Sequence, residues 1–349
     1  MAIEYSKLGD EDNARKTIDK LVIDYNDFPR KAETFWKLGQ YYRQDAKMYD
    51  QAAELYQYAA RTSPKDDDYT MFAQVELVKY YIRTADLAEG DEQYNRLVTE
   101  FAENKWLPSN ICFIGDTYLR AGEVDVANLL YNQVLTNWPD DPQTIYAKAG
   151  LAKVDFYLDL DENANQTIDE ILSNYADNPD IANAIYGIGD FCRTLAMFER
   201  QKEVSMANPN NSSHRPVKKG EKVKKYYERA CSAWERIIQD LPDSDVTPQA
   251  YHFAGECYGV LSQSDKMVEY YQKVVDMWPD YKGSSHLQTM IIRYYENLKR
   301  DGQITKTQAD QILRKGYENL INNYPDWPLT KLAFVWLESH EATEKGDLQ

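Results

Sequence analysis

Histidine and cysteine are scarce in this chain, whose 349 residues contain four of each. His214, His252, His286 and His340 lie far apart, so they form no pair at the helical spacing that metal sites use. The cysteines form no Cys-x-x-Cys pair, and we expect buried free thiols at Cys112, Cys192, Cys231 and Cys257. We therefore expect no metal site and no cofactor.

The motifs of common enzyme classes are also missing. The sequence contains no phosphate-binding glycine loop and no Gly-x-Ser-x-Gly nucleophile elbow. The acidic runs at Asp66–Asp68 and Asp159–Glu162 fall at predicted turns, where carboxylates cap or solvate helices. We expect that the chain is not an enzyme.

Long apolar runs and positive charge are lacking too. No stretch approaches the roughly 20 apolar residues of a membrane-spanning helix. The net charge of −17 disfavours binding to the phosphates of nucleic acids. The first residues, Met-Ala-Ile-Glu-Tyr, do not resemble a signal peptide. The location stays open between the cytoplasm and, if a signal peptide was removed, the periplasm or cell envelope.

What the sequence does contain is a repeated pattern of glycine, aromatic residues and proline. Its clearest copy consists of Ile111, Ile114-Gly115, Tyr118, Ala127, Tyr131, Val134 and Pro139. From the glycine onward the gaps are three, nine, four, three and five residues. These are the gaps of a helix–turn–helix repeat of about 34 residues.

Other copies keep this phase over most of the chain. One consists of Tyr251, Ala254-Gly255, Tyr258, Met267, Tyr271, Val274 and Pro279. Another, which needs one extra turn residue, consists of Phe35, Leu38-Gly39, Tyr42, Ala52, Tyr56, Ala59 and Pro64. The small residues suit helix crossings, the large ones fill the space between helices, and the prolines end the second helix.

The pattern resembles the tetratricopeptide family between about Ala14 and Pro325. The endings Tyr25-Asn-Asp-Phe-Pro29, Trp138-Pro-Asp-Asp-Pro142 and Tyr324-Pro-Asp-Trp-Pro328 are similar to bacterial envelope members of that family, such as outer-membrane assembly lipoproteins and the Tol-Pal coordinator. The resemblance implies an all-α, right-handed helical-repeat solenoid. It also implies a protein that binds partners along a concave groove.

We expect about eight helix pairs over residues 1–328 and a capping helix with a tail over 329–349. In this phase the first pair lacks half of its first helix, and we expect a processed product or a fragment of a longer array. An insertion at about 200–222 separates the helices of the sixth pair. It is basic, with Arg215, Lys218, Lys219 and Lys222 among its cations. This insertion is either two extended helices with a solvated loop, or a docking element for an acidic partner or for the chain's own acidic surface.

The resemblance also selects residues that would line the groove. Carried over by position, they are Trp36, Gln40, Arg43, Cys112, Asp116, Arg120, Tyr186, Asp190, Arg193, His252 and Glu256. The family's Lys and Asn carboxylate clamp is not present at these positions. Asp116 with Arg120 and Asp190 with Arg193 have the spacing of ion pairs within one helix. Such pairs either solvate the surface or bind polar groups of a partner.

The sequence thus favours a non-enzymatic scaffold for a protein or peptide partner. Two alternatives stay open. The chain is a structural subunit that assembles through its terminal repeats, or it is a regulatory domain of a larger protein. Neither nucleic acid nor a membrane span is expected in any of the three.

Overall fold

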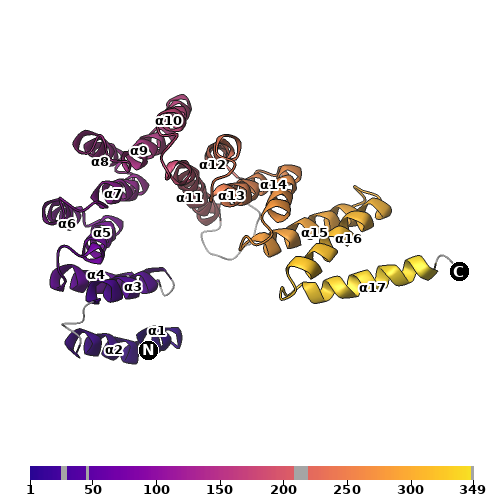
Figure 1. Ribbon diagram of the computed structural model, residues 1–349, viewed down its shortest axis with the longest axis horizontal. Helices are drawn as coiled ribbons and strands as arrows, with labels where there is room; N and C mark the ends of the chain where they lie inside the picture. The colour runs from indigo at the N-terminus through magenta and orange to yellow at the C-terminus, as the bar shows by residue number, and fades with distance from the viewer. Residues whose placement is uncertain (25–29, 45–46, 208–218, 347–349) are drawn as a thin grey trace. The chain divides into compact units, whose positions relative to one another are not determined.

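The computed structural model of the protein describes residues 1–24, 30–44, 47–207 and 219–346. All regular structure in these ranges is α-helical, in seventeen helices (Figure 1). This confirms the predicted all-α helical repeat. The chain divides into two compact units, unit 1 (Met1–Leu158) and unit 2 (Asp159–Gln349). The predicted ending at 25–29 lies outside the described residues.

Unit 1 is built from consecutive helices that pack in antiparallel pairs. Its helices are α1 (Ala2–Lys7), α2 (Glu11–Asp24), α3 (Lys31–Gln44), α4 (Tyr49–Thr62), α5 (Asp68–Arg83), α6 (Leu87–Glu100), α7 (Leu107–Ala121), α8 (Val124–Asn137) and α9 (Thr144–Tyr157). The first helices of successive pairs, α3, α5, α7 and α9, also pack against one another. One side of unit 1 is therefore formed by first helices alone.

Unit 2 continues the pairing with longer helices. These are α10 (Asp161–Asn174), α11 (Ile181–Ala207), α12 (Glu221–Asp240), α13 (Thr247–Val260), α14 (Ser264–Met277), α15 (Ser284–Arg300), α16 (Lys306–Asn323) and α17 (Thr330–Gly346). The pairs are α11 with α12, α13 with α14 and α15 with α16, and α17 packs against α16. Thr305 forms a capping box with Gln308, as expected for a residue that begins a helix after a turn.

The helices of a pair cross where a glycine meets an aromatic ring. A Cβ atom on Gly115 would lie 2.7 Å from the Tyr131 ring, and one on Gly255 would lie 2.6 Å from the Tyr271 ring. Gly39 meets Tyr56 in the same way. Because no real Cβ fits at these distances, a larger residue would push the helices apart. This is why the sequence pattern pairs glycine with an aromatic residue.

Tyr131 has a second glycine neighbour. Its ring also lies against Gly150 of α9, so that it separates the glycines of two successive first helices. The ring is fully buried, and its hydroxyl donates a hydrogen bond of 2.7 Å to Asp116. One side chain therefore sets both the crossing of α7 with α8 and the contact of α8 with α9.

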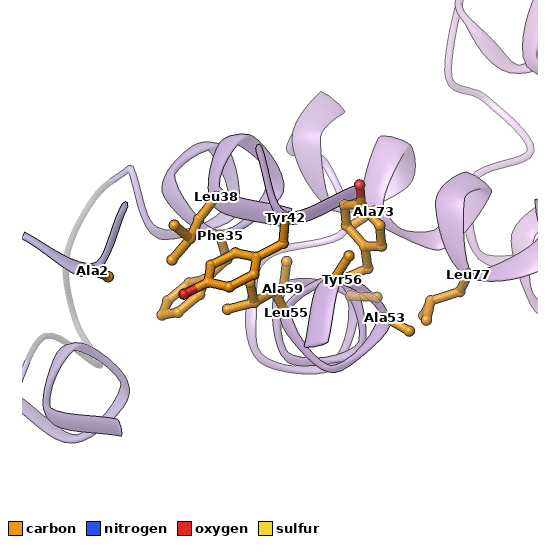
Figure 2. Close-up of a cluster of buried hydrophobic side chains, with 12 residues drawn as sticks. Ala2, Phe35, Leu38, Tyr42, Ala53, Leu55, Tyr56, Ala59, Ala73 and Leu77 are labelled. Atoms are coloured by element: carbon orange, nitrogen blue, oxygen red, sulfur yellow. The ribbon is translucent and has the colours of Figure 1, made fainter. Parts of the chain in front are cut away.

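The core follows the same pairing in α3 and α4. Phe35, Leu38 and Tyr42 of α3 pack against Leu55 and Tyr56 of α4 (Figure 2). Ala73 and Leu77 of α5 complete the cluster, which includes one residue of α1, Ala2. All four cysteines are buried and free, as the sequence predicted.

Turns within the pairs pass through one residue with a left-handed backbone. These residues are Gly9, Lys47, Ala85, Gly122, Asp159, Ser262 and Gly302, with φ between 59° and 91°. Four of the seven carry a side chain, although this conformation costs about 1–2 kcal/mol for a residue other than glycine. The packing of the helices fixes the turn even where the sequence offers no glycine.

The last described helix, α17, has two apolar sides. Ala333, Trp336 and Leu337 pack on the core formed with α16. Leu332, Phe334 and Val335 are 61%, 51% and 63% exposed. A terminal helix that only closed the array would carry a polar outer side.

Candidate partner-binding surface

The first helices of unit 1 are joined by aromatic contacts. Trp36 of α3 packs against Tyr69 and Phe72 of α5, with ring centroids 5.4 and 6.0 Å apart. Phe113 of α7 packs against Tyr146 of α9 at 5.6 Å, and 39% of Phe113 remains exposed. We call this side of unit 1 the first-helix surface.

An ion pair joins α3 to α5 on the same surface. Arg43 Nε lies 3.6 Å from Glu76 Oε2, and Lys79 Nζ lies 3.1 Å from Glu76 Oε1. The Gln40 side-chain oxygen accepts hydrogen bonds of 2.8 and 3.1 Å from Arg43. The predicted groove residues Gln40 and Arg43 are thus held against each other and against a carboxylate of the next repeat.

Glu76 is ionised although it is buried. Burial raises the pKa of its carboxyl group, but the charges of Lys79, Arg43 and Arg83 outweigh burial and hold the pKa below its ordinary value. The sequence analysis did not select Glu76. The sequence did offer one indication, namely an acidic residue flanked by apolar ones. Such a residue needs a partner, because acidic residues are rarely buried without one.

A second ion pair joins α7 to α9. Lys153 Nζ lies 2.7 and 2.9 Å from the two carboxylate oxygens of Asp116, and both residues are less than 10% exposed. Lys153 belongs to the next repeat, so this contact is one that spacing within a single helix did not predict. Arg120 is exposed. Cys112, one turn before Asp116, is buried, and burial raises the pKa of its thiol.

In unit 2 the predicted charged residues pair within single helices. Arg193 Nη2 lies 2.9 Å from Asp190 Oδ1 on α11, which is one of the predicted pairs. His252 Nε2 lies 3.4 Å from Glu256 Oε1 on α13. The hydrogen bond from His252 lowers the pKa of Glu256 against the opposing effect of burial.

Aromatic rings join α11 to α13 around these pairs. Phe253 stacks on His252 at 4.7 Å, and the Arg193 guanidinium lies 4.8 Å from the centroid of the Phe253 ring. Tyr186 packs against Phe253 at 6.3 Å, and the Tyr281 hydroxyl lies 3.0 Å from His252 Nδ1. Phe253 is a residue that the sequence analysis missed, although it lies next to a predicted one. The unit 2 group is therefore Tyr186, Asp190, Arg193, His252, Phe253, Glu256 and Tyr281.

The basic insertion is described only at its ends. Arg215 and Lys218 lie outside the described residues. Lys219 donates a hydrogen bond to the Val260 carbonyl oxygen, and Lys222 Nζ lies 3.4 Å from Glu199 Oε1. The two flanking helices extend into the insertion, α11 to Ala207 and α12 from Glu221, so the insertion is helical at both ends. Both described candidate lysines contact the chain itself.

In the ranges that the structure describes, no three His, Cys, Asp or Glu side chains are grouped so that they could hold a metal ion. None of the helices described combines the length and the apolarity that crossing a bilayer requires. What the residues do form is a set of half-exposed rings and charges, held in place by contacts between helices.

Comparison with known families identifies the repeat. The tetratricopeptide repeat model matches residues 248–281, which contain α13 and α14. The chain carries a tetratricopeptide repeat. The matched segment is one that the sequence pattern had placed in phase, with Gly255 at the helix crossing, and this confirms the family resemblance. No curated protein matches the sequence of the chain.

Three solved structures resemble the chain weakly and at low sequence identity. PilF of Pseudomonas aeruginosa is 13% identical, with 75% of this chain and 98% of that one covered and a TM-score of 0.34. A tetratricopeptide repeat protein of Parabacteroides merdae is 16% identical, with coverage of 75% and 99% and a TM-score of 0.31. A monomeric mutant of IFIT1 solved with Gppp-AAAA is 14% identical, with coverage of 98% and 71% and a TM-score of 0.35. TM-scores below 0.5 carry no conclusion about function.

Proposed function

We propose that the chain is a non-enzymatic protein–protein interaction scaffold that presents its first-helix surface to a partner protein or peptide. Tetratricopeptide repeats are generally protein-interaction modules, and stacked repeats create extended binding surfaces. The observation that carries the proposal is that rings and charges on this surface are fixed by contacts between neighbouring repeats. Because the side chains are already ordered, binding loses little conformational entropy on the scaffold side.

Phe113 is the best anchor for a partner on unit 1. It is 39% exposed, it rests on Tyr146, and Lys79 Nζ lies 5.9 Å from its ring centroid. Aromatic residues supply much of the binding energy at protein interfaces. In unit 2 the corresponding group is Arg193 above Phe253. We also propose that the other predicted groove residues belong to the surface that contacts the partner.

Partner capture with matched variants tests the proposal. The wild-type chain, Phe113→Ser and Leu129→Ser would each be used to capture cross-linked partners from cell extract, with quantification by mass spectrometry. Leu129 is 67% exposed on α8, a second helix, and serves as the control. We expect Phe113→Ser to lose the partners that Leu129→Ser retains. Equal retention by both variants would contradict the proposal.

A second candidate function is that of a structural subunit. The exposed side chains of Leu332, Phe334 and Val335 on α17 favour it, because an apolar helix side of this kind suits contact with another chain. Light scattering over a range of concentrations would detect assembly. The triple serine variant of these residues should then abolish it. A strict monomer at every concentration would eliminate self-assembly.

A further inference from the structure

A pocket with a volume of about 490 Å³ lies in unit 1 where α3, α4 and α5 meet. Arg43, Tyr56, Glu76, Tyr80 and Arg83 contribute to its walls. Pockets that bind small molecules measure about 300–1,000 Å³. The size of this pocket therefore suits a small molecule.

Two buried polar atoms in its walls have no hydrogen-bond partner. They are the hydroxyl of Tyr56, a residue only 1% exposed whose ring lies in the core of Figure 2, and Oε2 of Glu76, a residue 8% exposed. Arg83 is exposed at the pocket, and among the described residues its guanidinium forms no hydrogen bond or close ion pair, although its charge acts on Glu76. Buried polar groups in native proteins are normally paired. Arg43 is the charged neighbour of both atoms, and its Nε lies 3.6 Å from Glu76 Oε2, too far for a hydrogen bond, so each atom can still take a ligand as its partner.

The charge states of these groups define what such a ligand must offer. Glu76 is an ionised acceptor because the charges around it outweigh its burial and lower its pKa. Burial and the neighbouring Glu76 carboxylate raise the pKa of Tyr56, so its hydroxyl stays protonated and able to donate. Arg83 supplies a guanidinium, which binds carboxylates through two parallel hydrogen bonds.

Ligands of a single charge fit this set poorly. Arg43 and Arg83 repel a purely cationic ligand, and Glu76 with Asp50, another wall residue, repels a purely anionic one. A molecule that carries an ammonium group and a carboxylate offers a donor to Glu76 Oε2 and an acceptor to the Tyr56 hydroxyl and the Arg83 guanidinium. We propose that this pocket binds a free α-amino acid, with its ammonium group against Glu76 and its carboxylate against Arg83 and the Tyr56 hydroxyl.

Access to the buried atoms depends on Arg43. The Tyr56 hydroxyl and Glu76 Oε2 are shielded from solvent, so the amino acid reaches them when the half-buried Arg43 side chain shifts. The 3.6 Å distance between Arg43 Nε and Glu76 Oε2 is longer than a hydrogen bond, so an ammonium group can bind Oε2 after a small shift in which Arg43 keeps its hydrogen bonds to Gln40. The aromatic ring of Tyr80 provides a wall for the side chain of the amino acid.

Calorimetric titration of the full chain with each of the twenty standard amino acids tests the proposal. Succinate and methylamine serve as probes with a single type of charge. We expect saturable binding of at least one amino acid, about tenfold weaker in Glu76→Gln and in Arg83→Gln. The control Glu269→Gln, on α14 of unit 2, should bind as the wild type does.

Three results would overturn the proposal. They are the absence of saturable binding at millimolar concentration for every amino acid, equally tight binding of succinate or methylamine, and unchanged affinity in both pocket variants. Circular dichroism would show that each variant is folded, and Arg83→Gln, which changes an exposed side chain, avoids the stability effects of Glu76→Gln. The inference goes beyond the scaffold role, and the capture of partners through Phe113 does not depend on it.

Discussion

The two units use charge differently on their first helices. In unit 1 the Asp116 carboxylate binds Lys153 of a neighbouring repeat, and Glu76 binds Arg43 of a neighbouring repeat as well as Lys79 of its own helix. In unit 2 Asp190 and Glu256 bind residues of their own helices, Arg193 and His252. The first arrangement joins repeats to one another, and the second leaves each helix with its own pair.

The difference shows that a position in the repeat does not determine the role of a charge. A buried pair such as Asp116 with Lys153 has little water to compete with, whereas the exposed fractions of the Asp190 and Arg193 side chains are 36% and 24%. A buried charge that loses its partner is strongly destabilising, while an exposed one is solvated by water. We therefore expect unit 1 charges to maintain the array and unit 2 charges to be available to partners.

The largest effect is expected for Lys153→Met. The substitution leaves the Asp116 carboxylate buried without a cation, and we expect a loss of about 3–5 kcal/mol in the free energy of unfolding. Denaturant unfolding followed by circular dichroism measures the loss, and hydrogen exchange should place it in α7 and α9. The double variant Asp116→Leu/Lys153→Met should recover part of the loss. If Lys153→Met unfolds as the wild type does, the contact does not hold the repeats together.

Gly115→Trp and Gly255→Trp test whether the helix crossings of the two units are equivalent. Each indole would collide with the aromatic ring at the helix crossing, Tyr131 or Tyr271, and we expect about 3 kcal/mol of overpacking in both. Thermal unfolding should show similar losses in the two variants. A loss in only one of them would mean that the crossings of the two units are not equivalent.

A fall in pH should reduce the contribution of Glu76 to stability more than that of Glu256. The folded pKa of Glu76 is lowered, so its contribution to stability is present above the ordinary value of 4.5 and is lost as the pH falls through the lowered folded pKa. The wild type should therefore lose stability below about pH 4.5 more steeply than Glu76→Gln. Glu256 also has a lowered pKa, but its side chain is 43% exposed, so Glu256→Gln should change the slope less, and less again at high salt. Parallel pH profiles for wild type and Glu76→Gln would refute this assignment.

The smallest effect is expected for Arg193→Met. Its ion pair with Asp190 is partly exposed, so we expect a loss below about 1 kcal/mol in the free energy of unfolding. The same variant should weaken partner capture, because the guanidinium above Phe253 is removed from the surface. A large loss of stability with unchanged capture would show that Arg193 holds unit 2 together, as Lys153 is expected to do in unit 1.

The fold could be predicted from the sequence because its determinants are local. Gly115 and Tyr131 are 16 residues apart in one helix pair, and their spacing alone places a small residue against a ring. The cap at Thr305 and the burial of the cysteines follow from short segments in the same way. The left-handed turns at Lys47, Ala85 and Ser262 could not be predicted. The packing of the helices imposes them, and no glycine marks them in the sequence.

The candidate site was harder to predict because its contacts join different repeats. Spacing within a helix correctly predicted Asp190 with Arg193, but it could not predict Asp116 with Lys153, 37 residues apart. Which charges meet across two helices depends on their crossing angle and axial shift, and these are set by the core. Phe253 was missed for a related reason, since its role depends on α11 lying against it.

The position of the Tyr131 ring between Gly115 and Gly150 has a consequence for engineering the array. A module cut from α7 to α8 separates Tyr131 from Gly150, and a module cut from α8 to α9 separates it from Gly115. Only a module that runs from α7 to α9 keeps the ring with both glycines. Repeats of this chain should therefore be exchanged as a second helix together with the first helices on both sides of it.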